Sequence, residues 1–318
     1  MSVDGARHSG ATRGAVYAVA AYASWGLLPI YWKALARVPL LELLAHRVWL
    51  SSIFALLLLG TTRQVAVARD ALAAPPIRRA LVATSALIAL NWGLFIGTVA
   101  RGDVLAASLG YFLNPLVNVA LGVTFLRERL RPWQGAAVGV AAFGVAVLAF
   151  AGGGLPWVSL VLALSFGLYG LLRKAAPVAP VVSLAVETTL LAPIAVGYLL
   201  WLHVTGEAGL GRLPAMSGLL VAVSGVVTAM PLLWFAAAAQ RLRLSTLGLF
   251  QYLAPTGHLL LAVGIYHEPF AAPQLLAFGC VWAGLLLYSV DSARGAREAA
   301  RLAGNRAASG VHPSIEIT

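Results

Sequence analysis

The sequence predicts an all-α polytopic membrane protein, in which ten transmembrane helices form two inverted five-helix repeats around a central cavity. Two observations predict this fold. The first is composition: 60% of the 318 residues are hydrophobic, 10% are charged, and the mean hydropathy is +0.87. A soluble protein does not need that much apolar residue to build a core. The second is a pattern of prolines, glycines and glutamates that recurs 140 residues further along the chain.

Ten segments are long and apolar enough to cross a membrane, because a transmembrane helix needs about 20 mostly apolar residues. Short connections that carry Arg, Pro or Gly separate them. Residues 1–13 and 291–318 are polar, and we expect them to be disordered cytoplasmic tails. The ten predicted spans are 14–33, 41–60, 78–100, 103–125, 133–151, 155–174, 181–203, 215–239, 245–267 and 271–290.

The recurring pattern indicates an internal duplication. Pro115 is followed thirteen residues later by Glu128, and Pro255 is followed thirteen residues later by Glu268. Each copy contains five spans, so the second copy enters the membrane from the opposite side. A pseudo-two-fold axis in the membrane plane would then relate the two copies, and such duplicated units place transport sites at their interface. The two predicted repeats are residues 14–151 and 155–290.

The distribution of positive charge predicts the orientation. With a cytoplasmic N-terminus, most of the 22 Lys and Arg residues fall in cytoplasmic segments; Lys33, Arg37, Arg101 and Arg212 fall on the opposite side, and Arg47 lies within a span. This bias predicts a multi-pass protein of the cell membrane with both termini in the cytoplasm. The net charge of +11 is therefore explained by the loops, and we do not expect nucleic acid as a partner.

Several stretches resemble a known family. They include Tyr22 to Gly26, Glu42 with His46-Arg47, Asn91 to Phe95, Ala107 to Asn118, Ser165 to Lys174 and Arg241 to Tyr252. Together they resemble the RarD-type permeases of the EamA group, within the drug/metabolite transporter superfamily. The resemblance covers nearly all of residues 14–290. It implies a ten-helix transporter built from two EamA-type repeats, in a group whose name is associated with chloramphenicol sensitivity.

Glu42, His46 and Arg47 form the densest group of ionisable residues within a predicted span. Such residues are costly in a bilayer and usually face the interior of the bundle. Glu42 and His46 are four residues apart, share a helix face and can pair. The functional interpretation is a substrate or proton site, since His titrates near neutral pH. The structural alternative is that Glu42 complements the helix dipole and that Arg47 ties its helix to a neighbour.

Amides and aromatic residues supply the other candidate cavity residues. Amides on one helix face suit a cavity wall, or else hydrogen bonds between helices. Aromatic residues at mid-span suit stacking on a solute, whereas aromatic residues at the membrane interface form a belt. With the ionisable residues Glu42, His46 and Arg47, the predicted cavity set comprises Trp25, Asn91, Tyr111, Asn114, Asn118, Tyr169, Gln251, Tyr252 and His258.

Prolines, glycines and the remaining acids have structural interpretations. Prolines within spans are natural hinges. The spacings Gly135/Gly139 and Gly279/Ala283 favour close approach of helices, within the chain or in a homodimer. Glu128 and Glu268 recur at helix ends, which suits a repeated structural role, while Glu187 has no favoured role. The four predicted hinge residues are Pro29, Pro115, Pro231 and Pro255.

These features favour a secondary-active or facilitative transporter of a small amphiphilic solute, working by alternating access. No nucleotide-binding loop occurs in the sequence. A non-transporting receptor or scaffold is the first alternative. An intramembrane enzyme is the second, although neither an HExxH nor a GxSxG motif occurs. The single Cys280 cannot form an intramolecular disulfide, no Cys/His cluster has metal-ligand spacing, and we expect no metal or cofactor.

Overall fold

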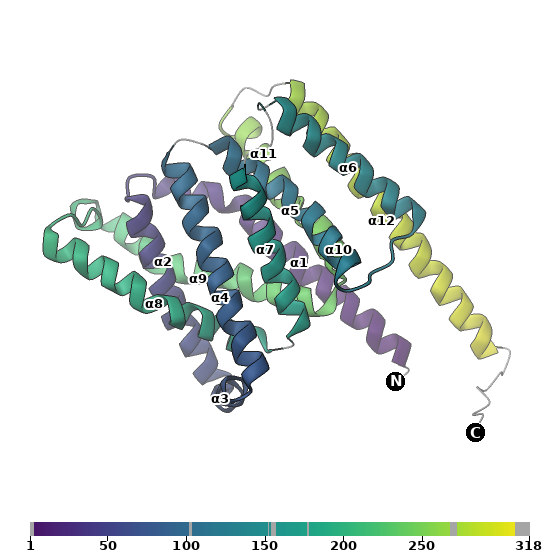
Figure 1. The fold of residues 1–318 in the computed structure, drawn as a ribbon, viewed down its shortest axis with the longest axis horizontal. Helices are drawn as coiled ribbons and strands as arrows, with labels where there is room; N and C mark the ends of the chain where they lie inside the picture. The colour runs from purple at the N-terminus through teal and green to yellow at the C-terminus, as the bar shows by residue number, and fades with distance from the viewer. Residues whose placement is uncertain are drawn as a thin grey trace. The chain divides into compact units, whose positions relative to one another are not determined.

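The computed structural model describes residues 3–101, 104–151, 153, 157–176, 178–267 and 272–308, and every element in these ranges is helical (Figure 1). The helices are α1 (Val3–Ala34), α2 (Leu40–Thr61), α3 (Val65–Ala73), α4 (Pro75–Ala100), α5 (Val104–Thr124), α6 (Pro132–Ala151), α7 (Trp157–Ala175), α8 (Pro180–Thr205), η1 (Leu210–Arg212), α9 (Ala215–Arg241), α10 (Leu244–Phe250), α11 (Leu253–Gly264) and α12 (Ala272–Ala308).

The predicted class, an all-α polytopic membrane protein, is confirmed. Nine segments of the described chain are long and apolar enough to cross a membrane, and they coincide with the last nine predicted spans. The first predicted span lies within α1, which packs against α9 and α11. Glu268 and the three residues that follow it lie outside the described residues.

The ninth span is interrupted. The predicted continuous segment 245–267 consists of α10 and α11, separated by Gln251 and Tyr252. Pro255 stands four residues after Gln251 and has no N–H to donate to its carbonyl, so the regular helical ladder cannot run through this point. Pro29, Pro115 and Pro231 instead lie inside continuous helices.

The prediction that both tails are disordered is wrong for the parts that the structure describes. Helix α1 begins at Val3, and α12 continues to Ala308. The distal part of α12 is rich in Ala and Arg, which have high helix propensity. A segment that continues an existing helix also avoids the unfavourable nucleation step, so polarity alone did not predict disorder here. A further short helix, α3, occupies part of the predicted loop between the second and third spans.

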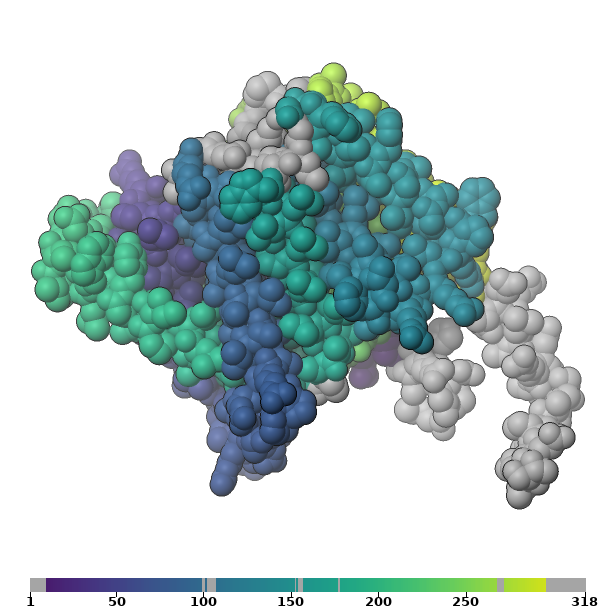
Figure 2. All heavy atoms as spheres, in the orientation of Figure 1, coloured from purple at the N-terminus to yellow at the C-terminus, as the bar shows by residue number. Residues whose placement is uncertain are grey.

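The chain forms two compact units that cross the predicted repeat boundary. Unit 1 comprises residues 1–128 and 149–270, and unit 2 comprises residues 129–148 and 271–318. Within unit 1 the helix contacts of one repeat recur in the other. By span order, α1 corresponds to α7, α4 to α9, and α5 to α10 with α11. The contact of α1 with α9 thus matches that of α7 with α4, and the contact of α1 with α11 matches that of α7 with α5. Figure 2 shows α4 and α7 side by side on the face toward the viewer. Helices of the two repeats therefore interdigitate, as a two-fold relation between the copies requires.

Unit 2 consists mainly of α6 and α12, which approach closely at two glycines. A Cβ atom on Gly144 would lie 2.7 Å from Ala277 O, and one on Gly284 would lie 2.7 Å from Ala137 O. These two glycines occupy equivalent places in the repeats. The sequence pattern instead favoured Gly135, Gly139 and Gly279, but a Cβ on any of these meets nothing within 4 Å in the described structure.

Replacing Gly144 by valine is expected to lower the stability of unit 2, because added atoms would meet the backbone of α12. Overpacking of this kind typically costs about 1–3 kcal/mol. Gly139→Val on the same helix is the matched control, since it carries the same change in helix propensity into open space. Thermal unfolding of both variants in detergent measures the difference. Equal melting temperatures for the two variants would contradict the close contact.

Candidate solute cavity

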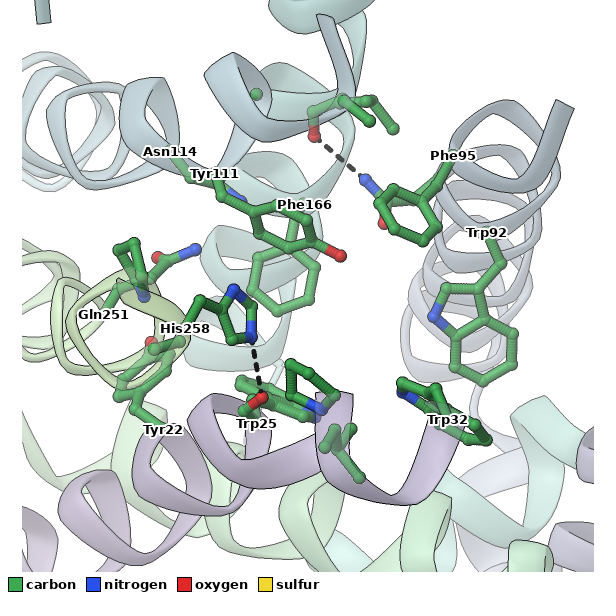
Figure 3. A pocket seen from close by; sticks show the side chains of 18 of the residues that line it. Tyr22, Trp25, Trp32, Trp92, Phe95, Tyr111, Asn114, Phe166, Gln251 and His258 are labelled. Atoms are coloured by element: carbon green, nitrogen blue, oxygen red, sulfur yellow. Dashed lines mark hydrogen bonds between the residues drawn. The ribbon is translucent and has the colours of Figure 1, made fainter. Parts of the chain in front are cut away.

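Unit 1 encloses a cavity of about 390 Å³ between its helices (Figure 3). Its walls come from α1, α2, α4, α5, α7, α9 and α11, with Gln251 from the break between α10 and α11. The lining residues are Tyr22, Trp25, Leu28, Pro29, Trp32, Arg47, Asn91, Trp92, Phe95, Ile96, Ala107, Gly110, Tyr111, Asn114, Leu162, Phe166, Thr228, Leu232, Gln251, Ala254, Pro255 and His258.

The cavity lies toward one end of unit 1. Its residues come from the second half of α1 and α4 and from the first half of α2, α5 and α7, so it lies toward the end at which α1 finishes and α2 starts. Toward the opposite end the helices form a tightly packed core. That core contains Tyr169, Phe235, Leu244 and Leu247, all with 0% exposure. The cavity is therefore shut off from that end by packed side chains.

Aromatic rings form the floor and the two facing walls. The Trp25 ring lies 5.4 Å from Tyr22 and 5.8 Å from Phe166, measured between centroids. In Figure 3, Phe166, Tyr111 and His258 stand on one side of the space, and Trp92 and Trp32 stand on the other. Rings in tilted and edge-to-face contact are favourable, and together they leave a space that suits a flat apolar group.

Arg47 is the cationic side chain of the cavity lining. Its Nε donates to Thr228 Oγ1 at 2.9 Å. The guanidinium lies over the Trp32 ring at 4.3 Å from the centroid and 5.8 Å from that of Trp92. The lining contains no Asp or Glu. The predicted contact of Arg47 with neighbouring helices thus consists of one hydrogen bond from its Nε and of ring contacts with Trp32 and Trp92.

Amide and imidazole groups tie the walls together. Asn91 Nδ2 donates to Leu162 O at 2.9 Å and to Ser165 Oγ at 3.0 Å, linking α4 to α7. His258 Nε2 lies 3.0 Å from the carbonyl oxygen of Trp25, linking α11 to α1. Asn114 differs from both: it is 3% exposed, and its Oδ1 has no hydrogen-bond partner in the described structure. This oxygen is fully buried in the structure, and a buried acceptor without a partner carries a penalty.

The structure brings most of the predicted cavity residues together and places the others elsewhere. Two of the four predicted hinge prolines, Pro29 and Pro255, also line the cavity. Those that line the cavity are Trp25, Arg47, Asn91, Tyr111, Asn114, Gln251 and His258; those that do not are Glu42, His46, Asn118, Tyr169, Tyr252, Pro115 and Pro231.

Glu42 and His46 do not form the predicted pair. The Glu42 carboxylate accepts from the backbone N–H groups of Gly209 at 2.8 Å and Leu210 at 3.1 Å, at the start of η1. His46 Nδ1 accepts from Trp49 Nε1 at 3.2 Å. No ion pair or hydrogen bond joins Glu42 to His46 among the described residues. Their spacing of four residues places both side chains on one helix face. The Glu42 carboxylate nevertheless binds two backbone N–H groups of a loop that is distant in the sequence.

The remaining predicted residues contribute to packing around the cavity. Asn118 Nδ2 donates to Gln251 Oε1 at 3.0 Å. Tyr252 OH donates to Phe112 O at 3.4 Å. The Tyr169 hydroxyl belongs to a buried ionic network with Arg173 and Glu187. The Asn118 Nδ2, the Tyr252 hydroxyl and the Tyr169 hydroxyl thus link neighbouring segments, whereas the Oδ1 of Asn118 has no hydrogen-bond partner in the described structure.

Sequence reasoning did not select Trp32 or Thr228. Trp32 follows Trp25 by seven residues and so lies on the same face of α1, and that spacing is a signal that could have found it. Thr228 is a small polar residue in an apolar helix, and nothing in the sequence distinguishes it from the other hydroxyl residues of the spans. Its role depends on Arg47, which is 181 residues away in the sequence.

Replacing His46 by alanine is expected to leave transport unchanged from about pH 5 to about pH 8, the range in which histidine titrates. The reason is that His46 does not line the cavity and contacts Trp49 on its own helix. Solute uptake into proteoliposomes, measured across this range, tests the expectation. A pH profile that changes in His46→Ala would restore the proton-relay hypothesis.

The fold and the cavity define a class of protein, a multi-pass membrane transporter. A solved crystal structure supports the fold: it matches with a TM-score of 0.67 over 90% of this chain and 98% of that one, at 19% identity. The model of the EamA-like transporter family matches residues 12–150.

Full-length relatives identify the family. The "Uncharacterized transporter YojE" of Bacillus subtilis is 41% identical over 91% of this chain and 97% of its own length. "Protein RarD" of Escherichia coli is 42% identical over 88% of this chain and 95% of its own length, and "Protein RarD" of Streptomyces exfoliatus is 43% identical over 89% and 90%. The chain belongs to the EamA-like transporter family and, within it, to the RarD-type permeases.

Proposed function

We propose that the protein carries a small amphiphilic solute across the cell membrane by alternating access, and that the solute binds in the cavity of unit 1. The observation that carries this proposal is the position of the cavity: it lies among membrane-spanning helices and is closed toward one end by fully buried side chains. A site that is shut off from one side is what one state of an alternating-access cycle requires.

The lining determines the kind of solute. The volume of about 390 Å³ falls within the range of small-molecule sites, which are mostly apolar with a few polar groups that set orientation. The apolar part of the solute would lie between Trp25 and Trp92. Its polar part would reach Arg47.

The two-fold pairing of helix contacts supports the transport cycle. If both termini are cytoplasmic, as the charge distribution predicts, the cavity lies in the outer half of the membrane. Transport then requires the contacts of α1 and α7 with the opposite repeat to change. The break at Gln251 and Tyr252 beside Pro255 is the natural place for this change, because the helix there lacks a regular hydrogen bond. Movement would be driven by a solute gradient or by exchange.

A matched pair of leucines tests the site. Leu28 lines the cavity, whereas the adjacent Leu27 does not and is 57% exposed. Leu28→Trp is expected to fill the cavity and abolish solute flux in proteoliposomes, and Leu27→Trp is expected to leave the flux intact. A set of aromatic solutes, chloramphenicol included, serves as the probe. The receptor alternative predicts binding without flux. Equal flux in the two variants would contradict the cavity as the transport site.

A further inference from the structure

Arg47 and Arg173 both lie within membrane-spanning helices of unit 1, but their surroundings differ. The Arg173 guanidinium forms an ion pair with Glu187 at 3.2 Å and donates to the Tyr169 hydroxyl from two nitrogens. This is the expected treatment of a charge that serves the structure, since buried charges need partners. Arg173 shows that this chain supplies a carboxylate where an intramembrane arginine has only a structural role.

Arg47 has no such partner. No carboxylate of the described chain lies within ion-pair distance of it. Its Nε donates to Thr228, and neither terminal nitrogen donates to a described protein group. The Trp32 and Trp92 rings lie close to the guanidinium, and such rings stabilise a cation only in part. The planar fork of the guanidinium is therefore available at the wall of the cavity.

We propose that the solute of this site is a small aromatic anion, a carboxylate or a similar oxyanion, whose charge pairs with the Arg47 fork while its ring lies among the cavity tryptophans. This inference rests on the proposed function and specifies its substrate class. Arginine suits the role because its two terminal nitrogens match the two oxygens of a carboxylate. A cationic solute would meet a like charge, and a neutral one would leave the guanidinium without a counter-charge.

The aromatic part of the proposal follows from the same geometry. Trp32 lies against the guanidinium, and Trp25 and Phe166 continue the aromatic lining from the adjoining side (Figure 3). A solute that reaches Arg47 with its anionic end is thus surrounded by rings along its body. An aliphatic anion would bind the same fork but would lose the contacts with the aromatic rings.

Three solutes with the same ring separate charge from shape: 3-phenylpropanoate, 3-phenylpropanamide and 3-phenylpropylamine. Binding to the full-length protein in lipid nanodiscs is measured by equilibrium dialysis. Wild-type protein is expected to bind the anion about tenfold or more tightly than the amide, the scale of one hydrogen-bonded charge contact. Arg47→Gln is expected to bind the anion and the amide alike, because it lacks the charge that distinguishes them.

Two outcomes would overturn the proposal. One is a wild-type protein that binds the amide or the amine at least as tightly as the anion. The other is an Arg47→Gln variant that keeps the preference for the anion. In both cases, continued binding and flux of the amide would leave the proposed transport function standing. An absence of binding and flux for all three solutes in the wild type would instead reject the transport site itself.

Two further variants keep the test decisive if Arg47→Gln does not assemble. Arg47→Lys keeps the charge without the fork and is expected to retain a reduced preference for the anion. Thr228→Val removes the partner of the Arg47 Nε and is expected to weaken anion binding more than amide binding. If both variants bind the anion as tightly as the wild type, neither the fork nor its anchor recognises the solute, and the proposal fails.

Discussion

Replacing Glu187 by leucine is expected to destabilise the protein by about 3–5 kcal/mol, the scale for removing one partner of a buried ion pair. Glu187 and Arg173 are 2% and 3% exposed. The Glu187 carboxylate accepts from Arg173 Nη2 at 3.2 Å, from Tyr169 OH at 3.2 Å and from the Thr84 hydroxyl. This network joins α4, α7 and α8. Without Glu187, the Arg173 charge would remain buried and uncompensated.

The double variant Arg173→Met/Glu187→Leu separates the charge from the packing. Because it removes both charges, it is expected to be considerably more stable than Glu187→Leu alone, as occurs when buried ion pairs are replaced by apolar residues. Thermal unfolding in detergent, followed by tryptophan fluorescence, measures both variants and the wild type. A double variant that is as unstable as the single one would show that shape, and not charge, accounts for the loss.

The sequence allowed the fold class and the positions of the membrane spans to be predicted, because membrane burial imposes long apolar runs that are visible without a structure. It did not reveal which polar residue meets which partner. Glu42 and His46 share a helix face, but the donors to Glu42 lie 167 residues away in the η1 loop. Local spacing determines a face and cannot determine a contact over that distance.

The level along α5 explains why Asn114 lines the cavity and Asn118 does not. Asn114 and Asn118 lie on one face of α5, as predicted, but they are one helical turn apart. Asn114 borders the cavity, whereas Asn118, one turn further along, does not and donates from its Nδ2 to Gln251. The same face therefore contributes one cavity residue and one packing residue. The floor of the cavity passes between them, and no periodicity in the sequence marks that level.

Replacing Glu128 by alanine is expected to loosen the closed end of unit 1. Its carboxylate, which is 7% exposed, accepts from Leu244 N at 2.6 Å, from Ser245 N at 3.0 Å and from Ser245 Oγ at 2.6 Å. Leu244 also belongs to the buried core that shuts off the cavity from this end. The contact of Glu128 with Arg243, which is 42% exposed, adds about 0–1 kcal/mol, so the hydrogen bonds dominate.

Hydrogen exchange at the start of α10 measures this loosening. The loss of hydrogen bonds to a charged acceptor corresponds to about 1.5–3 kcal/mol, or about tenfold to a hundredfold faster exchange of the Leu244 and Ser245 amides. Glu128→Gln is expected to fall between alanine and the wild type, because its amide nitrogen cannot accept from Ser245. Glu42→Ala is the matched control, since that carboxylate also binds two backbone N–H groups, those of Gly209 and Leu210.

The control variant Glu42→Ala tests whether an effect on transport is specific to the end near Glu128. Glu42→Ala should accelerate exchange only at Gly209 and Leu210, and Glu128→Ala only at α10, because the two carboxylates hold different loops. If the end near Glu128 must open for the solute to leave the cavity, then Glu128→Ala should also change the rate of solute exchange, whereas Glu42→Ala should not. Unaltered exchange of the α10 amides in Glu128→Ala would show that the packed core alone holds this end closed.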